Sequence, residues 1–159
     1  MLNQDYKDML RALAEENVRF LLVGAYAMAV HGYLRTTTDI DIWVMPSSDN
    51  ADAVLRAAKR FGAPLHEVTK SDFERDDTVF QIGVAPRRID ILTGLSGLEF
   101  EAAFQRSVET DLDGVPVRVL SVDDLIQNKR AAGRMRDLAD AEAMEALRDA
   151  GPLSSSDAE

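Results

Sequence analysis

The chain has no cysteine among its 159 residues, which excludes disulfide bonds, thiolate metal sites and a cysteine nucleophile. It has only two histidines, His31 and His66, and they give little support to a histidine-based metal site. No apolar run approaches the roughly 20 residues that a membrane-spanning helix needs. Residues 1–17 have the pattern of an amphipathic helix and lack the basic and apolar regions of a signal peptide. We therefore expect a cytoplasmic protein without a membrane partner.

Positive charge is also scarce, because 18 lysines and arginines oppose 28 aspartates and glutamates, for a net charge of −10. A protein of this charge is repelled by the phosphate backbone at long range, so we expect no non-specific binding to nucleic acid. A local basic face could still hold one RNA. The candidate residues for such a face are Arg87, Arg88, Lys129, Arg130, Arg134 and Arg136.

The length and composition indicate one globular domain. Hydrophobic residues at 46% and charged residues at 29% are ordinary for such a domain, and 159 residues suffice to bury a core. We predict a single domain over residues 1–150, with its core at about 18–120 and C-terminal helices at 121–149. The segment 151–159, which contains a proline and a serine run, is predicted to be a disordered tail.

Apolar periodicity alternates between helical and strand-like stretches along this domain. The helix-like segments are residues 4–16, 25–31, 50–61, 98–106, 122–132 and 135–149. The strand-like segments are residues 19–23, 39–44, 78–84, 87–93 and 115–120. The predicted fold is α+β (α/β in looser usage), with a mixed sheet of four or five strands that is covered by helices and extended by a C-terminal helical pair.

Aspartates stand out on two of the predicted strands. The strand period of two places Asp39 and Asp41 on one face, with Ile40 and Ile42 on the other. Two like charges this close are stable only when solvated or bridged by a cation, and Mg²⁺ prefers oxygen ligands. Asp90 on a later strand supplies the third carboxylate that a two-metal site requires. The alternative for each strand is a solvated edge without a ligand.

The segment before the first aspartates favours a phosphate site. A buried-type strand at residues 20–23 leads into Gly24 and Ala25 and then into a helical stretch. A strand, a glycine and a helix N-terminus together present backbone N–H groups to phosphate oxygens. Tight packing at the turn is the alternative explanation of a single glycine.

In combination these motifs resemble the polymerase-β-like nucleotidyltransferase superfamily over residues 20–140. Within it, the closer likeness is to stand-alone bacterial AbiEii-type toxin nucleotidyltransferases. That likeness rests on Val23-Gly24-Ala25-Tyr26-Ala27, His31-Gly32, Arg35, Thr37, Asp39-Ile40-Asp41, Ser121-Val122-Asp123-Asp124-Leu125-Ile126, Lys129, Arg134, Asp137 and Asp140. One departure is Ala25, which stands where the superfamily has a second glycine or a serine.

The resemblance implies a site of metal-binding, catalytic and nucleotide-binding residues. Asp39, Asp41 and Asp90 would hold two Mg²⁺ ions, with Mn²⁺ as a substitute, and would be catalytic together with Lys129. Gly24, Ala25, Arg35 and Asp137 would bind the nucleotide. On one continuous helix Lys129 and Asp137 would share a stripe with Asp140, and the alternative is an ordinary surface charge pattern. A salt bridge that orders the loop is the alternative for Arg35.

The expected reaction moves a nucleoside monophosphate from a nucleoside triphosphate to an acceptor hydroxyl. The acceptor is open: a toxin paired with a cognate antitoxin protein would modify RNA, an antibiotic-type enzyme would modify a small molecule, and a protein acceptor also fits. The non-enzymatic alternative is a degenerate nucleotidyltransferase fold that binds a nucleotide or a partner, and Ala25 favours it.

Overall fold

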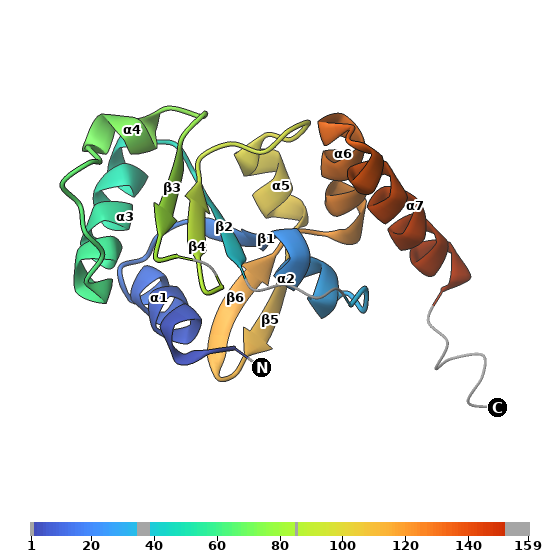
Figure 1. Cartoon of the computed structure of the whole chain (residues 1–159), viewed down its shortest axis with the longest axis horizontal. Coiled ribbons are helices and arrows are strands. Elements are labelled where there is room, and N and C mark those ends of the chain that lie inside the picture. The colour runs from blue at the N-terminus through green and yellow to red at the C-terminus, as the bar shows by residue number, and fades with distance from the viewer. Residues whose placement is uncertain (1, 35–38, 85, 152–159) are drawn as a thin grey trace.

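The computed structural model describes residues 2–34, 39–84 and 86–151 (Figure 1). In this part of the chain seven helices and six strands follow one another. They are α1 (Gln4–Glu15), β1 (Phe20–Val23), α2 (Gly24–Val30), β2 (Ile40–Val44), α3 (Ser48–Phe61), α4 (Lys70–Glu74), β3 (Val79–Ile82), β4 (Ile89–Leu92), α5 (Phe100–Arg106), β5 (Val108–Leu112), β6 (Val115–Val119), α6 (Val122–Ala132) and α7 (Met135–Ala150).

The strands form one mixed sheet in the order β3-β4-β2-β1-β6-β5. The central strand β2 runs antiparallel to β1 and parallel to β4, with Val23 opposite Asp41 on one side and Asp90 opposite Asp41 on the other. The register therefore brings the end of β1 and the two aspartates to the same level of the sheet.

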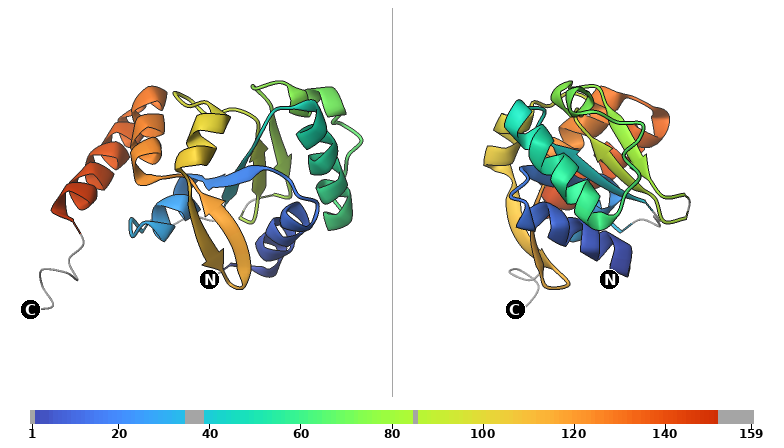
Figure 2. Two further views of the ribbon diagram at one scale, coloured as in Figure 1. Left: turned by 180° about the vertical axis from the view of Figure 1, so that it is seen from behind. Right: turned by 90° about the vertical axis from the view of Figure 1, so that its left-hand side faces the viewer.

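The two faces of β2 differ as the period of two predicts. Ile40, Ile42 and Val44 are completely buried and belong to the main hydrophobic core. Helices α1 and α3 lie side by side in front of the sheet in the right-hand view of Figure 2. The opposite face carries Asp41 and Trp43, and Phe100 at the start of α5 packs edge-on against Trp43 with ring centroids 5.1 Å apart.

A buried amide fixes the turn from β2 into α3. Asn50 accepts a hydrogen bond from the backbone N–H of Arg19 at 2.8 Å and donates to the carbonyl oxygens of Arg19 and Met45 at 3.1 and 3.0 Å. The side chain thus pairs the Arg19 N–H and the Met45 carbonyl, and it adds a second bond to the Arg19 carbonyl, which also accepts from the Met45 N–H at 3.2 Å.

The predicted α+β class and the C-terminal helical pair are confirmed, but the sheet has six strands instead of four or five. The sequence prediction missed β5, which is mostly exposed and has an acidic residue at every second position, Glu109 and Asp111. It also missed the short helix α4. The prediction for the tail beyond residue 151 lies outside the described residues. No helix in the described ranges is long and apolar enough to cross a membrane.

Candidate active site

The three predicted aspartates come together on adjacent strands. Asp41 on β2 lies directly opposite Asp90 on β4, and Asp39 occupies the position just before β2. Asp90 is 7% exposed, so its carboxylate is held within the fold rather than on a solvated edge. The structure thus places all three carboxylates at one end of the β2–β4 pair.

Gly24 is where β1 meets this group. Its backbone has φ +72°, and a Cβ added there would lie 2.3 Å from the Asp41 Oδ2 atom. An L-residue is disfavoured by this φ, and a methyl group at this distance would collide with the carboxylate. The glycine is therefore required by the packing of Asp41, a reason that the sequence pattern alone did not reveal.

Arg88 binds two of the three carboxylates. Its Nε atom donates to Asp90 Oδ1 at 2.8 Å, and its Nη2 atom lies 3.1 Å from Asp39 Oδ2. The Tyr6 hydroxyl, completely buried on α1, donates to the backbone carbonyl of Arg88 at 3.2 Å. The guanidinium thus bridges Asp39 and Asp90 from a fixed position on the sheet.

The environment of Asp41 disfavours its charged form. Burial, followed by the charges of Asp90 and Asp39, raises the pKa of Asp41 from 3.8 to about 6, while Arg88 and Lys129 act in the opposite direction. A pKa in this range means that part of the population is protonated near neutral pH. Among the three carboxylates, Asp41 would therefore gain most from a bound cation.

Lys129 faces the site from α6 and is held there by a buried acidic pair. Its Nζ lies 3.5 Å from Asp137 Oδ1 and 3.3 Å from Asp140 Oδ2 on α7. The two aspartates are 1% and 4% exposed. The helix does not continue through Gly133, which ends α6 at φ +75°, so the helical hairpin rather than one stripe brings the three residues together.

One cavity of about 470 Å³ contains these groups, and we call it the carboxylate cavity. Its lining consists of Gly24, Ala25, Met28, Asp39, Asp41, Arg88, Asp90, Lys129, Arg134 and Arg136. The predicted catalytic residues and the Gly24-Ala25 pair therefore share one cavity.

One predicted nucleotide-binding residue, Asp137, has other contacts, and another cannot be compared. Asp137 does not line the carboxylate cavity, because it accepts hydrogen bonds from the Arg134 backbone N–H and guanidinium at the start of α7. The bond to the guanidinium Nε is 2.6 Å long. Arg35 lies outside the described residues. Arg134 and Arg136 are lining residues to which the sequence prediction gave no role in nucleotide binding, and their position after Gly133 was the available signal.

The chemistry of the donor set fits a divalent cation, because three carboxylates gather where burial, followed by the charges of Asp90 and Asp39, raises the pKa of Asp41. Their arrangement is adapted to Arg88 instead. Within the described ranges, no group of three histidine, aspartate or glutamate side chains stands ready to hold a metal ion. A metal would therefore have to take Asp39 or Asp90 from the guanidinium.

The mixed sheet and the clustered carboxylates agree with the nucleotidyltransferase class, and the sequence family shows that class. Over residues 2–154 the sequence matches the family described as "Nucleotidyl transferase of unknown function (DUF2204)", and the chain belongs to that family. A search of curated protein sequences found no match.

Two solved structures are similar in fold. The crystal structure of TM1012 from Thermotoga maritima, assigned as a nucleotidyltransferase, has a TM-score of 0.58 at 17% identity and covers 94% of both chains. The solution structure of the antibiotic-resistance factor ANT(2'')-Ia has a TM-score of 0.56 at 17% identity, covering 92% of this chain and 88% of that chain. At this identity the likeness shows the fold alone.

The raised pKa of Asp41 predicts that Asp41→Asn stabilises the protein at neutral pH. A folded-state pKa of about 6 against 3.8 means that the folded protein holds the proton more tightly than the unfolded chain. The contribution of Asp41 to the free energy of unfolding therefore falls as pH rises from about 4 to 6, and it stays lower above pH 6. At pH 7.5 the variant should gain about 1–3 kcal/mol, and the gain should shrink toward pH 4.5. Thermal unfolding across this pH range measures it.

The matched control for this change is Glu142→Gln, which removes an exposed carboxylate from α7. It should leave the pH dependence of the melting temperature unchanged. A loss of stability in Asp41→Asn at pH 7.5, or a gain that does not depend on pH, would contradict the strained-carboxylate interpretation.

Gly24→Ala is predicted to destabilise the protein more than an alanine at another glycine of positive φ. Gly62→Ala is the matched control, because Gly62 has φ +94° with nothing within 4 Å of an added Cβ. Both changes carry the left-handed backbone cost of about 1–2 kcal/mol, but only the first displaces Asp41. Melting temperatures compare the two variants, and equal losses would show that Asp41 can move aside without cost.

Proposed function

We propose that this protein transfers a nucleoside monophosphate from a nucleoside triphosphate to an acceptor hydroxyl in a reaction that depends on Mg²⁺. The observation that carries the proposal is the register of Asp41 against Asp90, with Asp39 in the same cavity. Burial, together with the charges of Asp90 and Asp39, raises the pKa of Asp41, and a bound cation would offset this cost. Membership of a nucleotidyl transferase family gives independent support.

In the proposed reaction the acceptor hydroxyl oxygen forms a bond to the α-phosphorus of the triphosphate. The bond between that phosphorus and the bridging oxygen to the β-phosphate breaks, and pyrophosphate leaves with the electron pair. Asp90 takes up the hydroxyl proton. Gly24 and Ala25, with Lys129, Arg134 and Arg136 across the carboxylate cavity, surround the space where the triphosphate charge would be neutralised.

Asp39, Asp41 and Asp90 would hold Mg²⁺, or Mn²⁺ in its place. When bound, such ions neutralise phosphate charge and lower the pKa of an attacking hydroxyl. The part of this chain in the binding step is the release of Asp39 and Asp90 by Arg88, because the guanidinium now occupies their oxygens.

One observation favours the non-catalytic alternative. Arg88 neutralises two of the carboxylates and so gives Asp39 and Asp90 a structural reason to be present. If Arg88 never left them, the fold would serve as a nucleotide-binding or partner-binding protein. Metal affinity decides between the two, because a permanent bridge would exclude the ions.

The basic residues considered for an RNA face are largely engaged within the protein. Arg88, Lys129, Arg130 and Arg134 each pair with a carboxylate. Their charge is therefore partly cancelled, which weakens the attraction of an extended RNA backbone more than that of one triphosphate held in the cavity. We favour a small-molecule acceptor over the RNA acceptor of a toxin.

The proposed function predicts that Mg²⁺ together with one of the four common nucleoside triphosphates raises the melting temperature of the protein. Ligand at about a hundred times its dissociation constant adds about 2.7 kcal/mol, or roughly 5–10 °C for a domain of this size. The shift should disappear in Asp39→Ala/Asp41→Ala, with each variant compared with its own ligand-free baseline. No shift with any triphosphate would make the non-catalytic alternative the better one.

A second prediction concerns Arg88. Because the guanidinium competes for Asp39 and Asp90, Arg88→Ala should bind Mn²⁺ about 10- to 150-fold more tightly, as expected for the loss of a charge-assisted hydrogen bond of about 1.5–3 kcal/mol. The free-ion signal of Mn²⁺ in electron paramagnetic resonance measures this directly, without a turnover assay. Arg87→Ala is the control, since Arg87 is an exposed neighbour. Equal Mn²⁺ affinity in the two variants would mean that Arg88 does not compete.

A further inference from the structure

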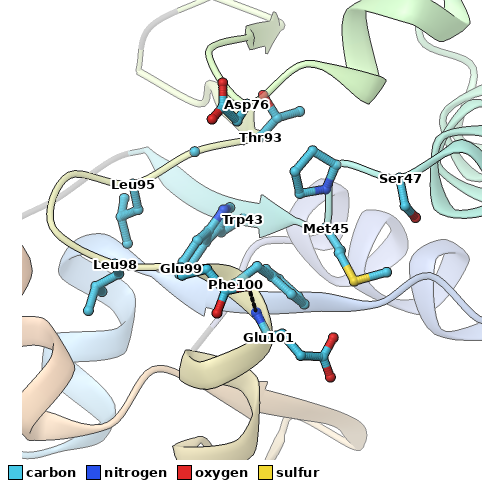
Figure 3. Close-up of a pocket in the computed structure, with 12 residues that line it drawn as sticks. Trp43, Met45, Ser47, Asp76, Thr93, Leu95, Leu98, Glu99, Phe100 and Glu101 are labelled. Atoms are coloured by element: carbon cyan, nitrogen blue, oxygen red, sulfur yellow. Dashed lines mark hydrogen bonds between the residues drawn. The ribbon is translucent and has the colours of Figure 1, made fainter.

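A second cavity opens at the far end of β2, beyond the carboxylates. It has a volume of about 390 Å³, within the usual range of small-molecule sites. We call it the tryptophan pocket; its lining consists of Trp43, Met45, Pro46, Ser47, Asp76, Thr93, Gly94, Leu95, Leu98, Glu99, Phe100 and Glu101 (Figure 3). It shares no lining residue with the carboxylate cavity.

The indole of Trp43 supplies a hydrogen-bond donor without an acceptor. The side chain is 1% exposed, and its Nε1 atom has no hydrogen-bond partner in the described part of the chain. In Figure 3 the nitrogen lies on the edge of the ring that is turned toward Asp76 and Thr93, across the pocket. A buried N–H group of this kind is normally paired, so its position predicts an acceptor atom on a bound molecule.

The walls and the rim of the pocket differ in character. Leu95, Leu98 and Phe100 form an apolar wall, and Phe100 stacks edge-on against Trp43. Asp76, Glu99 and Glu101 contribute carboxylates, and the described lining contains no lysine, arginine or histidine. Arg19 neutralises Glu101 through two hydrogen bonds. Glu99 accepts hydrogen bonds from the backbone N–H groups of Glu101 and Ala102 in α5, and the charge of Arg106 also acts on it. Asp76 is the third carboxylate of the lining. The pocket therefore favours a cation.

The two cavities lie along one face of the same strand. Asp41 and Trp43 are two residues apart on β2, which corresponds to about 7 Å. The carboxylate cavity is lined by its three aspartates and also by four basic residues, Arg88, Lys129, Arg134 and Arg136, whereas the tryptophan pocket has only acidic charge. The charges thus divide the face into one side suited to a triphosphate and another side suited to a positively charged molecule.

We propose that the tryptophan pocket binds the acceptor, and that this acceptor is a small cationic molecule with an apolar body and an oxygen that accepts a hydrogen bond from Trp43. The role as acceptor rests on the proposed function, but the ligand class rests on the pocket alone. The protonated amine lies at the rim near Asp76, and the apolar body lies against Phe100. A hydroxyl group then extends along β2 toward Asp41.

The test uses the full chain and the fact that Trp43 is its only tryptophan. A ¹⁵N-labelled protein gives a single indole N–H cross-peak, which reports the hydrogen bond of this one group. The probes are 6-aminohexan-1-ol, hexylamine, 1,6-hexanediol and 6-hydroxyhexanoate, which vary the charge and the oxygen on one carbon chain. We expect 6-aminohexan-1-ol to move the cross-peak downfield at the lowest concentration, hexylamine and the diol to bind more weakly, and the anion not to bind.

Two variants assign the contacts through ligand-observed NMR. Trp43→Phe keeps the aromatic packing but removes the donor, and it should weaken 6-aminohexan-1-ol about fivefold without changing the affinity for hexylamine. Asp76→Asn should weaken both amines about two- to fivefold and leave 1,6-hexanediol unchanged. Asp77→Asn, at an exposed neighbour outside the pocket lining, should change nothing.

Three results would overturn the inference. The probes could leave the cross-peak unmoved at tens of millimolar, so that the indole binds water alone; the anionic probe could bind as well as the amine; or adenosine or uridine could occupy the pocket in preference, which would make it a base site. None of these measurements needs metal or triphosphate. Binding of the amine without any Mg²⁺–triphosphate shift would therefore reject the proposed function and keep the pocket, and the reverse pattern would reject the pocket alone.

Discussion

Repulsion among three carboxylates at one level of the sheet is the constraint on which the rest of the site depends. The parallel pairing of β2 with β4 forces Asp41 against Asp90, and neither strand can shift by one residue without turning its core isoleucines outward. Two features of the chain accommodate the three carboxylates. Gly24 leaves room for the Asp41 carboxylate, and the Arg88 guanidinium bridges Asp39 and Asp90. The charge at Asp41 remains only partly compensated, so burial and the neighbouring charges of Asp90 and Asp39 still raise its pKa to about 6.

The C-terminal helical hairpin, α6 and α7, places a positive charge on the other side of the cavity from the three carboxylates. Holding the long side chain of Lys129 in one position costs conformational entropy, and the three carboxylates across the cavity would not by themselves fix it. Asp137 and Asp140, both buried, fix its ammonium group, and Arg134 in turn caps the first turn of α7 through Asp137. A lysine restrained in this way loses little conformational entropy when a phosphate arrives. Asp137 then acts as a support for Lys129, while its predicted contact with a nucleotide stays a prediction.

Much of this arrangement could be predicted from sequence because it follows from periodicity. The alternation of Asp39, Ile40, Asp41 and Ile42 fixes which face each side chain takes, and it required no tertiary information. The role of Arg88 could not be predicted in the same way, since its guanidinium reaches across to β2 and strand pairing is not visible in one sequence. The strand β5 was missed although Asp113-Gly114, with positive φ at both residues, is a strong hairpin signal. The exposed and acidic residues of β5 lack the apolar alternation of a half-buried strand, so only the turn indicated the hairpin.

Two costly features occur on the same face of β2. Asp41 carries a charge whose burial is incompletely compensated, and Trp43 buries an N–H group without a partner in the described chain. An unpaired buried donor costs about 1–3 kcal/mol, so neither feature benefits the free protein. Both costs would be recovered by ligands of opposite character, a cation at Asp41 and an oxygen acceptor at Trp43. Since the two residues are neighbours on one face, the simplest arrangement that relieves both is a triphosphate with its metal at one end of the strand and an acceptor molecule at the other.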